Sequence, residues 1–246
     1  MKLVKWEQLP PEMQTDAVRP YYAALKKKRA GLLLKRLFDI VVSVLMLIIL
    51  LPVFLILAIA IKLDSPGPVF YRQVRVTQYG KRFRIHKFRT MVQNADRGSQ
   101  ITLNRDNRIT RVGKVIRDCR LDEIAQLIDV IQGTMTLCGV RPESPKYVAH
   151  YTDEMMATLL LPAGVTSLAS IYYKDEAKLL DGSDDTDKVY IEEILPGKMY
   201  YNLKGIAQFS FWSDIKIMFM TVFAVLGKEY KGDYQPAEAE KEKQTV

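Results

Sequence analysis

The sequence has few of the residues that build disulfide frameworks and transition-metal sites. Its 246 residues include two cysteines, Cys119 and Cys138, and two histidines, His86 and His150. Two cysteines cannot form a disulfide framework, so a reducing compartment fits the chain. No Cys/His spacing resembles a zinc site, and the histidines lie far apart in sequence, so we interpret both as structural.

Several other signals are missing. We find no internal repeat and no nucleic-acid-binding motif, and basic residues beside an apolar segment have a simpler explanation in lipid. The long apolar run begins at residue 40 and is not followed by a small-x-small cleavage site, which argues against a signal peptide. Acidic residues number 28 against 36 basic ones, and the net charge of +8 suits an anionic partner such as phospholipid or a phosphorylated substrate.

Residues 40–61 carry no charge and have a proline, Pro52, near their middle. A straight helix of this length would measure about 33 Å, enough for a single transmembrane span. However, Pro52 removes a backbone donor and clashes with the carbonyl of Ile48, so the helix should kink or break there.

The charges on either side of this apolar run also bear on its topology. Basic residues flank it on both sides: Lys26, Lys27, Lys28, Arg29, Lys35 and Arg36 upstream, and Lys62, Arg72, Arg75, Lys81, Arg82 and Arg84 downstream. Positive flanks tend to stay in the cytoplasm, so the two clusters oppose a spanning orientation. We therefore predict a re-entrant helical hairpin that bends at Pro52 and has both ends in the cytoplasm.

The rest of the chain predicts a helix-rich α/β membrane-associated domain. We divide it into a polar and basic lead-in (1–34), the membrane hairpin (35–64), a cytoplasmic domain (65–227) and a disordered tail (228–246). Strands are expected around 69–74 and 82–88, joined by a turn at Tyr79-Gly80. Residues 206–227 form either a core helix or an amphipathic interfacial helix, and their aromatic content favours the interface.

A further helix is predicted within residues 113–133. Its apolar residues recur at i, i+3, i+4 and i+7, namely Ile124, Leu127, Ile128 and Ile131, and Gly133 stands where a C-cap glycine would. Asp122 falls at the expected N-cap, where it could serve only as a cap. The alternative is that the Asp122-Glu123 pair performs chemistry.

Five short motifs, in order, favour that alternative. They are Lys35-Arg36-Leu37-Phe38-Asp39, Ser65-Pro66-Gly67-Pro68 with Val69-Phe70-Tyr71-Arg72-Gln73, Lys87-Phe88-Arg89-Thr90-Met91, Leu121-Asp122-Glu123-Ile124-Ala125-Gln126-Leu127 and Gly139-Val140-Arg141-Pro142. With the proline-broken apolar helix, they resemble the bacterial sugar transferase family, the monotopic polyprenyl-phosphate phosphoglycosyl transferases, in its short form. The resemblance covers roughly residues 35–227.

This resemblance implies a reaction and its participants. A nucleoside diphosphate sugar, by expectation a UDP-sugar, would pass its sugar 1-phosphate to polyprenyl phosphate and begin a capsule, exopolysaccharide or other glycan. Asp122 would be the nucleophile, and Glu123 would serve a Mg²⁺ ion. The enzyme would work at the cytoplasmic face of the bacterial inner membrane, in contact with lipid; a homodimer is left open.

Phosphoryl transfer also requires cations to neutralise the phosphates. Residues expected to bind them are Arg117, Arg120, Arg141, Lys87 and Arg89, since arginine can clamp phosphate oxygens bidentately. Each has an ordinary alternative: Arg117 and Arg120 as a solvated helix entry, Arg141 in a surface turn, and Lys87 and Arg89 on lipid headgroups. The competing function for the whole chain is a non-enzymatic membrane adaptor that binds anionic lipid or an export complex.

Overall fold

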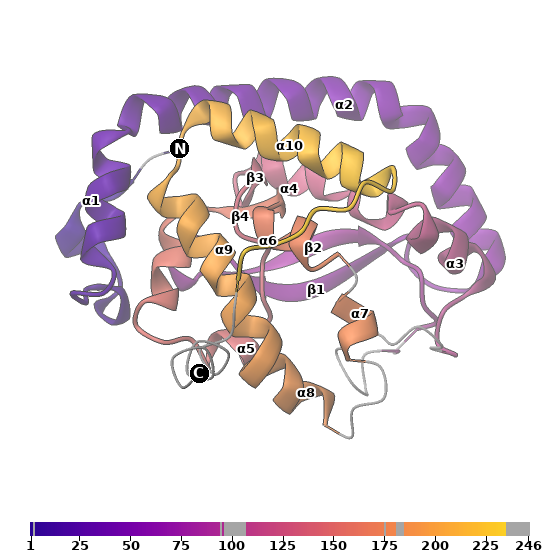
Figure 1. Ribbon diagram of the computed structural model, residues 1–246. Coiled ribbons are helices and arrows are strands. Elements are labelled where there is room, and N and C mark those ends of the chain that lie inside the picture. Colours follow the sequence, from indigo (N-terminus) through magenta and orange to yellow (C-terminus); the bar gives the residue numbers. More distant parts are fainter. Residues whose placement is uncertain (2, 94, 96–106, 175, 181–184, 235–246) are drawn as a thin grey trace.

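The computed structural model describes residues 1, 3–93, 95, 107–174, 176–180 and 185–234. Helices surround two small sheets, and one very long helix runs across the top of the molecule (Figure 1). The strands are β1 (Phe70–Val76), β2 (Arg82–Phe88), β3 (Met135–Cys138) and β4 (Ala163–Thr166). The α-helices are α1 (Arg19–Lys27), α2 (Arg29–Asp64), α3 (Arg111–Asp118), α4 (Gln126–Gln132), α5 (Pro145–Val148), α6 (Leu168–Tyr172), α7 (Glu176–Leu179), α8 (Thr186–Val189), α9 (Leu195–Ala207) and α10 (Phe211–Val225). Shorter helical turns are η1 (Trp6–Gln8), η2 (Pro11–Met13), η3 (Gln78–Gly80), η5 (Leu121–Glu123), η6 (Met155–Leu160) and the π-turn η7 (Tyr190–Ile194).

The apolar run lies inside α2, which continues through Pro52 without a break. Among the described residues, α2 is the helix long and apolar enough to cross a membrane, judged by length and composition. Figure 1 shows it extending along the top of the domain and then turning down along one side. Its outer face is exposed and apolar along the whole run, with Val41, Leu45, Ile48, Ile49, Leu55, Ile56 and Ile59 open to the surroundings.

The predicted hairpin of strands is confirmed. Strands β1 and β2 pair antiparallel from Phe70 opposite Phe88 to Val76 opposite Arg82. Tyr79 takes a left-handed conformation (φ 58°) in the connecting turn η3, beside Gly80. Successive residues of β2 point to opposite faces of the ribbon, which places Lys87 on the opposite side from Arg84.

Strands β3 and β4 form a short parallel pair, with Thr136 opposite Gly164 and Cys138 opposite Thr166. The backbone of Gly164 passes close to that of Gly139: its N–H donates to the Val140 carbonyl (2.7 Å), and a Cβ on it would lie 2.3 Å from the Gly139 nitrogen. This close approach fixes the start of the segment that leads from β3 to Arg141.

The helix expected over residues 113–133 is instead interrupted. Helix α3 ends at Asp118, Arg120 turns the chain with a left-handed conformation (φ 56°), and η5 carries Asp122 and Glu123 before α4 begins. The N-cap residues are Thr110 for α3 and Ala125 for α4, so the prediction that Asp122 is an N-cap is wrong. The apolar spacing from Ile124 onward correctly predicted α4, and Gly133 ends that helix (φ 88°). The spacing of apolar residues gave no sign of the turn at Arg120.

The first residues form more than a polar lead-in. The short helical pieces predicted there are present as η1, η2 and α1, and they bury Leu9, Met13, Val18 and Leu25 in one cluster with η6 residues such as Leu160. At the other end, α10 buries Asp214 and Ile217 and leaves Trp212 and Phe219 exposed, as an amphipathic helix would. The described part of the predicted tail lies against α9, where Asp233 pairs with Lys204; residues 235–246 lie outside the described residues.

The Gly139–Gly164 approach supports a stability prediction. We expect Gly164→Ala to lower the free energy of unfolding by about 1–3 kcal/mol, because the added methyl group overlaps backbone atoms that cannot move aside cheaply. Gly205→Ala in α9 is the matched control: a Cβ there meets no atom within 4 Å. In the control, alanine should leave stability unchanged or raise it by up to about 1 kcal/mol. Denaturant unfolding of both variants in detergent would check this, and an equal effect of the two substitutions would contradict the packing described.

Candidate active site

The turn η5 lies on an apolar floor built from four parts of the chain. Leu57 and Ile61 of α2, Phe88 of β2, Ile116 of α3 and Ala125 form one buried cluster. Leu121 and Ile124, the residues on either side of Asp122-Glu123, pack against it. The apolar neighbours therefore face inward and anchor the turn that carries the two carboxylates.

Glu123 is held by two cations. Arg141 grips the carboxylate with both terminal nitrogens, Nη1 donating to Oε2 at 2.9 Å and Nη2 donating to Oε1. Lys87 Nζ adds a third contact to Oε1 at 3.2 Å. Burial alone would raise the pKa of Glu123, but Arg141 and Lys87 outweigh it and hold that pKa well below its ordinary value. Glu123 is therefore ionised at any physiological pH.

Asp122 has a different environment. Within the described part of the chain, no hydrogen bond or ion pair engages its carboxylate. Burial raises its pKa above the ordinary value, while the charges of Lys87, Arg117 and Arg141 oppose that rise and Glu123 adds to it. The two adjacent carboxylates are thus unlike: Glu123 is paired on both oxygens, and Asp122 is surrounded by positive charge without being bonded to it.

The structure also places the other residues expected to bind phosphate. Arg117, on the last turn of α3, is close enough to affect Asp122 electrostatically. Arg120 is exposed at the left-handed turn, and its Nη2 donates to the carbonyl of Lys174 at 3.3 Å. Arg117, Lys87 and Arg141 therefore surround Asp122 with positive charge, whereas the Arg120 guanidinium is bonded to the backbone of Lys174 instead.

Arg89 does not join this group. Its guanidinium is buried at the C-terminal end of α2, where it donates to the carbonyls of Pro66 (2.9 Å) and Ser65 (2.6 Å) and to Ser65 Oγ (2.9 Å). The backbone of Gly67 is left-handed beside it, with φ 124°. Arg89 thus fastens the turn after α2 to the end of β2. Neither interpretation made from the sequence, phosphate binding or a lipid headgroup contact, describes this position.

A buried network behind Arg141 was not anticipated from the sequence. Glu143 accepts hydrogen bonds from Tyr190 OH (2.7 Å) and Lys198 Nζ (2.9 Å), and Lys198 also pairs with Glu176 at 3.1 Å. The backbone carbonyl of Glu143 accepts from Val76 N of β1 (3.0 Å). These bonds fix the chain just after Arg141, and the contact between Gly139 and Gly164 fixes it just before Arg141. In the sequence, the sign of this network was Glu143 itself, an acidic residue directly after Arg141-Pro142. Its partners Tyr190 and Lys198 lie more than 40 residues away, so no local pattern connects them.

His86 has the structural role expected for it. Its backbone N–H and ring Nδ1 both meet the carboxylate of Asp129, at 2.8 Å each, in the interior. This interaction joins β2 to α4, so the strand that carries Lys87 and the helix that follows Glu123 are held to each other.

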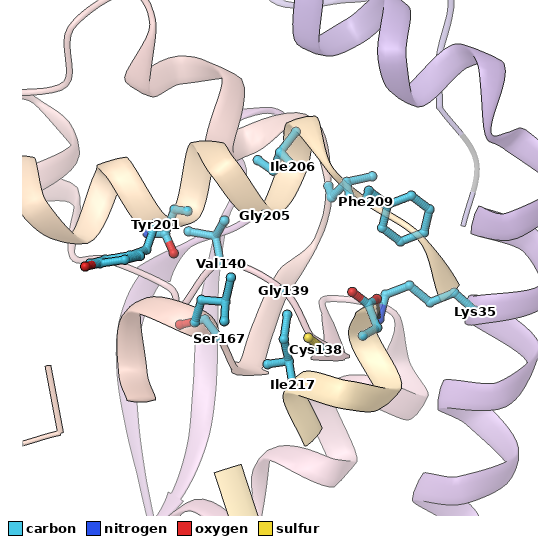
Figure 2. A pocket seen from close by; sticks show the side chains of 14 residues that line it. Lys35, Cys138, Gly139, Val140, Ser167, Tyr201, Gly205, Ile206, Phe209 and Ile217 are labelled. Atoms are coloured by element: carbon cyan, nitrogen blue, oxygen red, sulfur yellow. Dashed lines mark ion pairs between the residues drawn. The ribbon is translucent and has the colours of Figure 1, made fainter. Parts of the chain in front are cut away.

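A small cavity of about 50 Å³ lies elsewhere, between α2, α9 and α10. Figure 2 shows Lys35 reaching toward it from α2, with Cys138, Gly139 and Val140 on another side. Lys35 is buried and pairs with Asp214 of α10 at 2.7 Å. Neither Asp122 nor Glu123 lines the cavity, which lies behind the segment that precedes Arg141 and is no part of the basic site.

The acidic groups of the site suit one kind of metal ion. No cluster of three or more His, Cys, Asp or Glu that could hold a metal occurs in the part of the chain that the structure describes. Mg²⁺ is commonly bound by one or two carboxylates, with substrate phosphate and water completing its shell. The carboxylate of Glu123 could supply one such ligand, beside the contacts that it makes with Arg141 and Lys87.

The site leads to a prediction about ionisation. Lys87→Met should raise the pKa of Asp122 further, because the cation that most strongly opposes the effect of burial is lost. Since protonation neutralises the carboxylate, its ionised form would then disappear at a higher pH than in the parent protein. Carbon-13 NMR titration of aspartate-labelled protein would measure the shift, with Asp122→Asn assigning the signal. Lys81→Met, at an exposed position next to the turn of the β1–β2 hairpin, is the control; an unchanged Asp122 pKa in Lys87→Met would refute this electrostatic description.

Comparison with known proteins now adds to this geometry. The family model described as bacterial sugar transferase matches residues 30–228. A protein of Aeromonas hydrophila named UDP-N-acetylgalactosamine-undecaprenyl-phosphate N-acetylgalactosaminephosphotransferase is 38% identical over 197 residues, which cover 78% of this chain and 44% of that protein. A protein of Klebsiella pneumoniae named UDP-glucose:undecaprenyl-phosphate glucose-1-phosphate transferase is 37% identical, covering 78% and 40%. One of Caulobacter vibrioides with the same name is 34% identical, covering 78% and 69%.

The chain therefore spans less than half the length of the first two relatives. The residues that match the family model include the apolar helix, the β1–β2 hairpin and the Asp122 site. The family match covers most of the chain and begins with α2. The chain belongs to the bacterial sugar transferase family.

Proposed function

We propose that this protein transfers a sugar 1-phosphate from a nucleoside diphosphate sugar to polyprenyl phosphate, with Asp122 as a covalent nucleophile. The observation that carries the proposal is the difference between the two carboxylates: Glu123 is held by Arg141 and Lys87, and Asp122 is unbonded among the same cations. The names of the relatives, which include UDP-sugars and undecaprenyl phosphate, support the choice of donor and acceptor.

In the first step, an oxygen of the Asp122 carboxylate attacks the phosphorus that bears the sugar. The bond from that phosphorus to the bridging oxygen of the diphosphate breaks, and the nucleoside monophosphate leaves with the electron pair. Arg117, Arg141 and Lys87 reduce the repulsion between the carboxylate and the diphosphate and neutralise charge on the leaving group.

In the second step, an oxygen of polyprenyl phosphate attacks the same phosphorus. The bond to Asp122 breaks, the carboxylate is restored, and polyprenyl diphosphate sugar is released. Two displacements at one phosphorus predict ping-pong kinetics. Mg²⁺, when bound by Glu123, would supply additional positive charge to the phosphates.

We also propose that α2 enters the bilayer from the cytoplasmic side and returns to it, with Pro52 favouring the bend. Both ends of α2 bind the same domain: Arg36 bonds to α4, and Asp64 bonds to α3. A helix that crossed the membrane would separate these ends. The exposed apolar faces of α2 and α10 would meet lipid, so that Asp122 stays near the headgroups where the acceptor phosphate lies.

The proposed reaction makes Asp122 indispensable. Asp122→Asn should lower turnover by at least about a thousandfold, because the amide cannot form the covalent intermediate. The measurement is Mg²⁺-dependent release of nucleoside monophosphate from a panel of UDP-sugars, with undecaprenyl phosphate in phospholipid vesicles. Asp118→Asn, an exposed acidic residue at the end of α3, is the control and should keep full activity.

Full turnover by Asp122→Asn would refute the covalent mechanism. Release of no nucleoside monophosphate by the parent protein from any donor would instead favour the membrane adaptor considered from the sequence.

The proposed topology has its own test. In a Cys119→Ser background, single cysteines at the exposed positions Ala30 and Lys62 should both react with a membrane-impermeant maleimide in inverted vesicles and not in intact cells. A cysteine at Ile49, which is 73% exposed in the protein, should stay unlabelled because lipid would cover it. Reaction of the two flanks from opposite sides would contradict the re-entrant topology.

A further inference from the structure

Helix α2 does more in this structure than present an apolar face. We propose that α2 is a positioning element for the turn that carries Asp122 and Glu123, acting through two polar tethers: Arg36 on the end of α4 and Asp64 on the start of α3. The catalytic consequence rests on the proposed function, but the mechanical coupling does not. Arg36 and Asp64 are thus positioning residues rather than catalytic ones.

The first tether lies at the C-terminal end of α4. Arg36 Nη1 donates to the carbonyl of Val130 at 2.7 Å, and Nη2 donates to that of Ile131 at 3.2 Å. These carbonyls belong to the last turn of α4, where the helix itself provides no N–H donor. The C-cap residue Gly133 also donates to the Val130 carbonyl, at 3.1 Å. A guanidinium is well suited to this end of a helix, since it satisfies two acceptors and carries positive charge.

The second tether lies at the N-terminal end of α3. Asp64, the last residue of α2, accepts from the backbone N–H of Val112 at 3.0 Å, and Val112 is the second residue of α3. The side chain of Thr110 accepts from Gly113 N at 3.0 Å in the same turn. Asp64 therefore completes a cap that Thr110 begins, although it comes from an element 48 residues away.

Between these tethers, the part of α2 after Pro52 forms the floor of the site. Leu57 and Ile61 are buried against Ile116 of α3 and Ala125, and Leu121 and Ile124 pack on them. The bonds from Arg89 to Ser65 and Pro66 keep the end of α2 in place. One helix therefore contacts the element before η5, the element after it, and the turn itself, and Figure 1 shows α2 passing from above α4 to beside α3.

This arrangement has a consequence for the turn. Asp122 lies in a short 3₁₀ turn between two helices of eight and seven residues, which are too short to hold one another rigidly. Fixing α3 and α4 to separate points on α2 sets their relative position. A shift of α2, such as a change in its bend, would therefore move the two ends of the turn relative to each other.

Hydrogen–deuterium exchange tests the coupling without requiring turnover. In Arg36→Met and Asp64→Ala, amides of residues 113–131 should exchange about five- to tenfold faster, as loss of a charge-assisted hydrogen bond would allow. Amides of α9, in another part of the domain, should be unchanged. Arg29→Met and Asp153→Ala remove the same charges at exposed positions and should leave residues 113–131 as they are in the parent protein. Unaltered exchange of that segment in both tether variants, or equal acceleration in α9, would overturn the proposal.

Turnover then tests the catalytic consequence. A misplaced nucleophile should lower kcat by about ten- to a hundredfold with the donor KM within about twofold, because positioning and not binding is lost. Asp64→Glu, which keeps a carboxylate acceptor, should recover most of the rate, and vesicle binding should be unchanged in all variants. A KM effect alone, or loss of vesicle binding that accounts for the lost rate, would contradict a positioning role. A parent protein without turnover would refute the proposed function, and exchange would still decide the coupling.

Discussion

The rest of the site depends on the pairing of Glu123 with Arg141 and Lys87. This pair of contacts draws together β2, η5 and the loop after β3, three segments that are separate in sequence. Removing one partner of this partly buried ion pair would leave the remaining charge without its counterion. Glu123 thus serves as the fixed member of the carboxylate pair. Asp122 remains free of such bonds, as a group that must form and break a covalent bond should be.

The surrounding structure supports this pairing from both sides. The glycine contact between β3 and β4 and the Glu143–Lys198 pair hold the loop of Arg141, and the Asp129–His86 interaction holds the strand of Lys87. Helix α2 completes the support by packing Leu57 and Ile61 against the residues around η5. Its outer face remains apolar and exposed, so the element that would contact lipid is also the one that contacts the turn of Asp122.

Much of this could be predicted from short-range pattern. Alternation and a glycine turn sufficed for the β1–β2 hairpin, and the uncharged run sufficed for the apolar part of α2. Motif order indicated Asp122, Glu123, Lys87, Arg117 and Arg141, which the structure brings into one basic site. The same reasoning failed for Arg89, whose role is set by a distant partner, the turn after α2. It also missed the left-handed backbone of Arg120, which interrupts a helix whose apolar spacing is regular. Lys198 and Asp64 have no local signal, because their partners lie far along the chain.

The proposed mechanism requires a covalent bond between Asp122 and a sugar-bearing phosphorus. This bond can be detected by mass spectrometry of the protein after brief exposure to Mg²⁺ and an active UDP-sugar, with no polyprenyl phosphate present. We expect a mass increase equal to one sugar phosphate, located by fragmentation at Asp122 and lost when the acceptor is added. An adduct on another residue, or rapid turnover with no adduct that the acceptor can discharge, would contradict it.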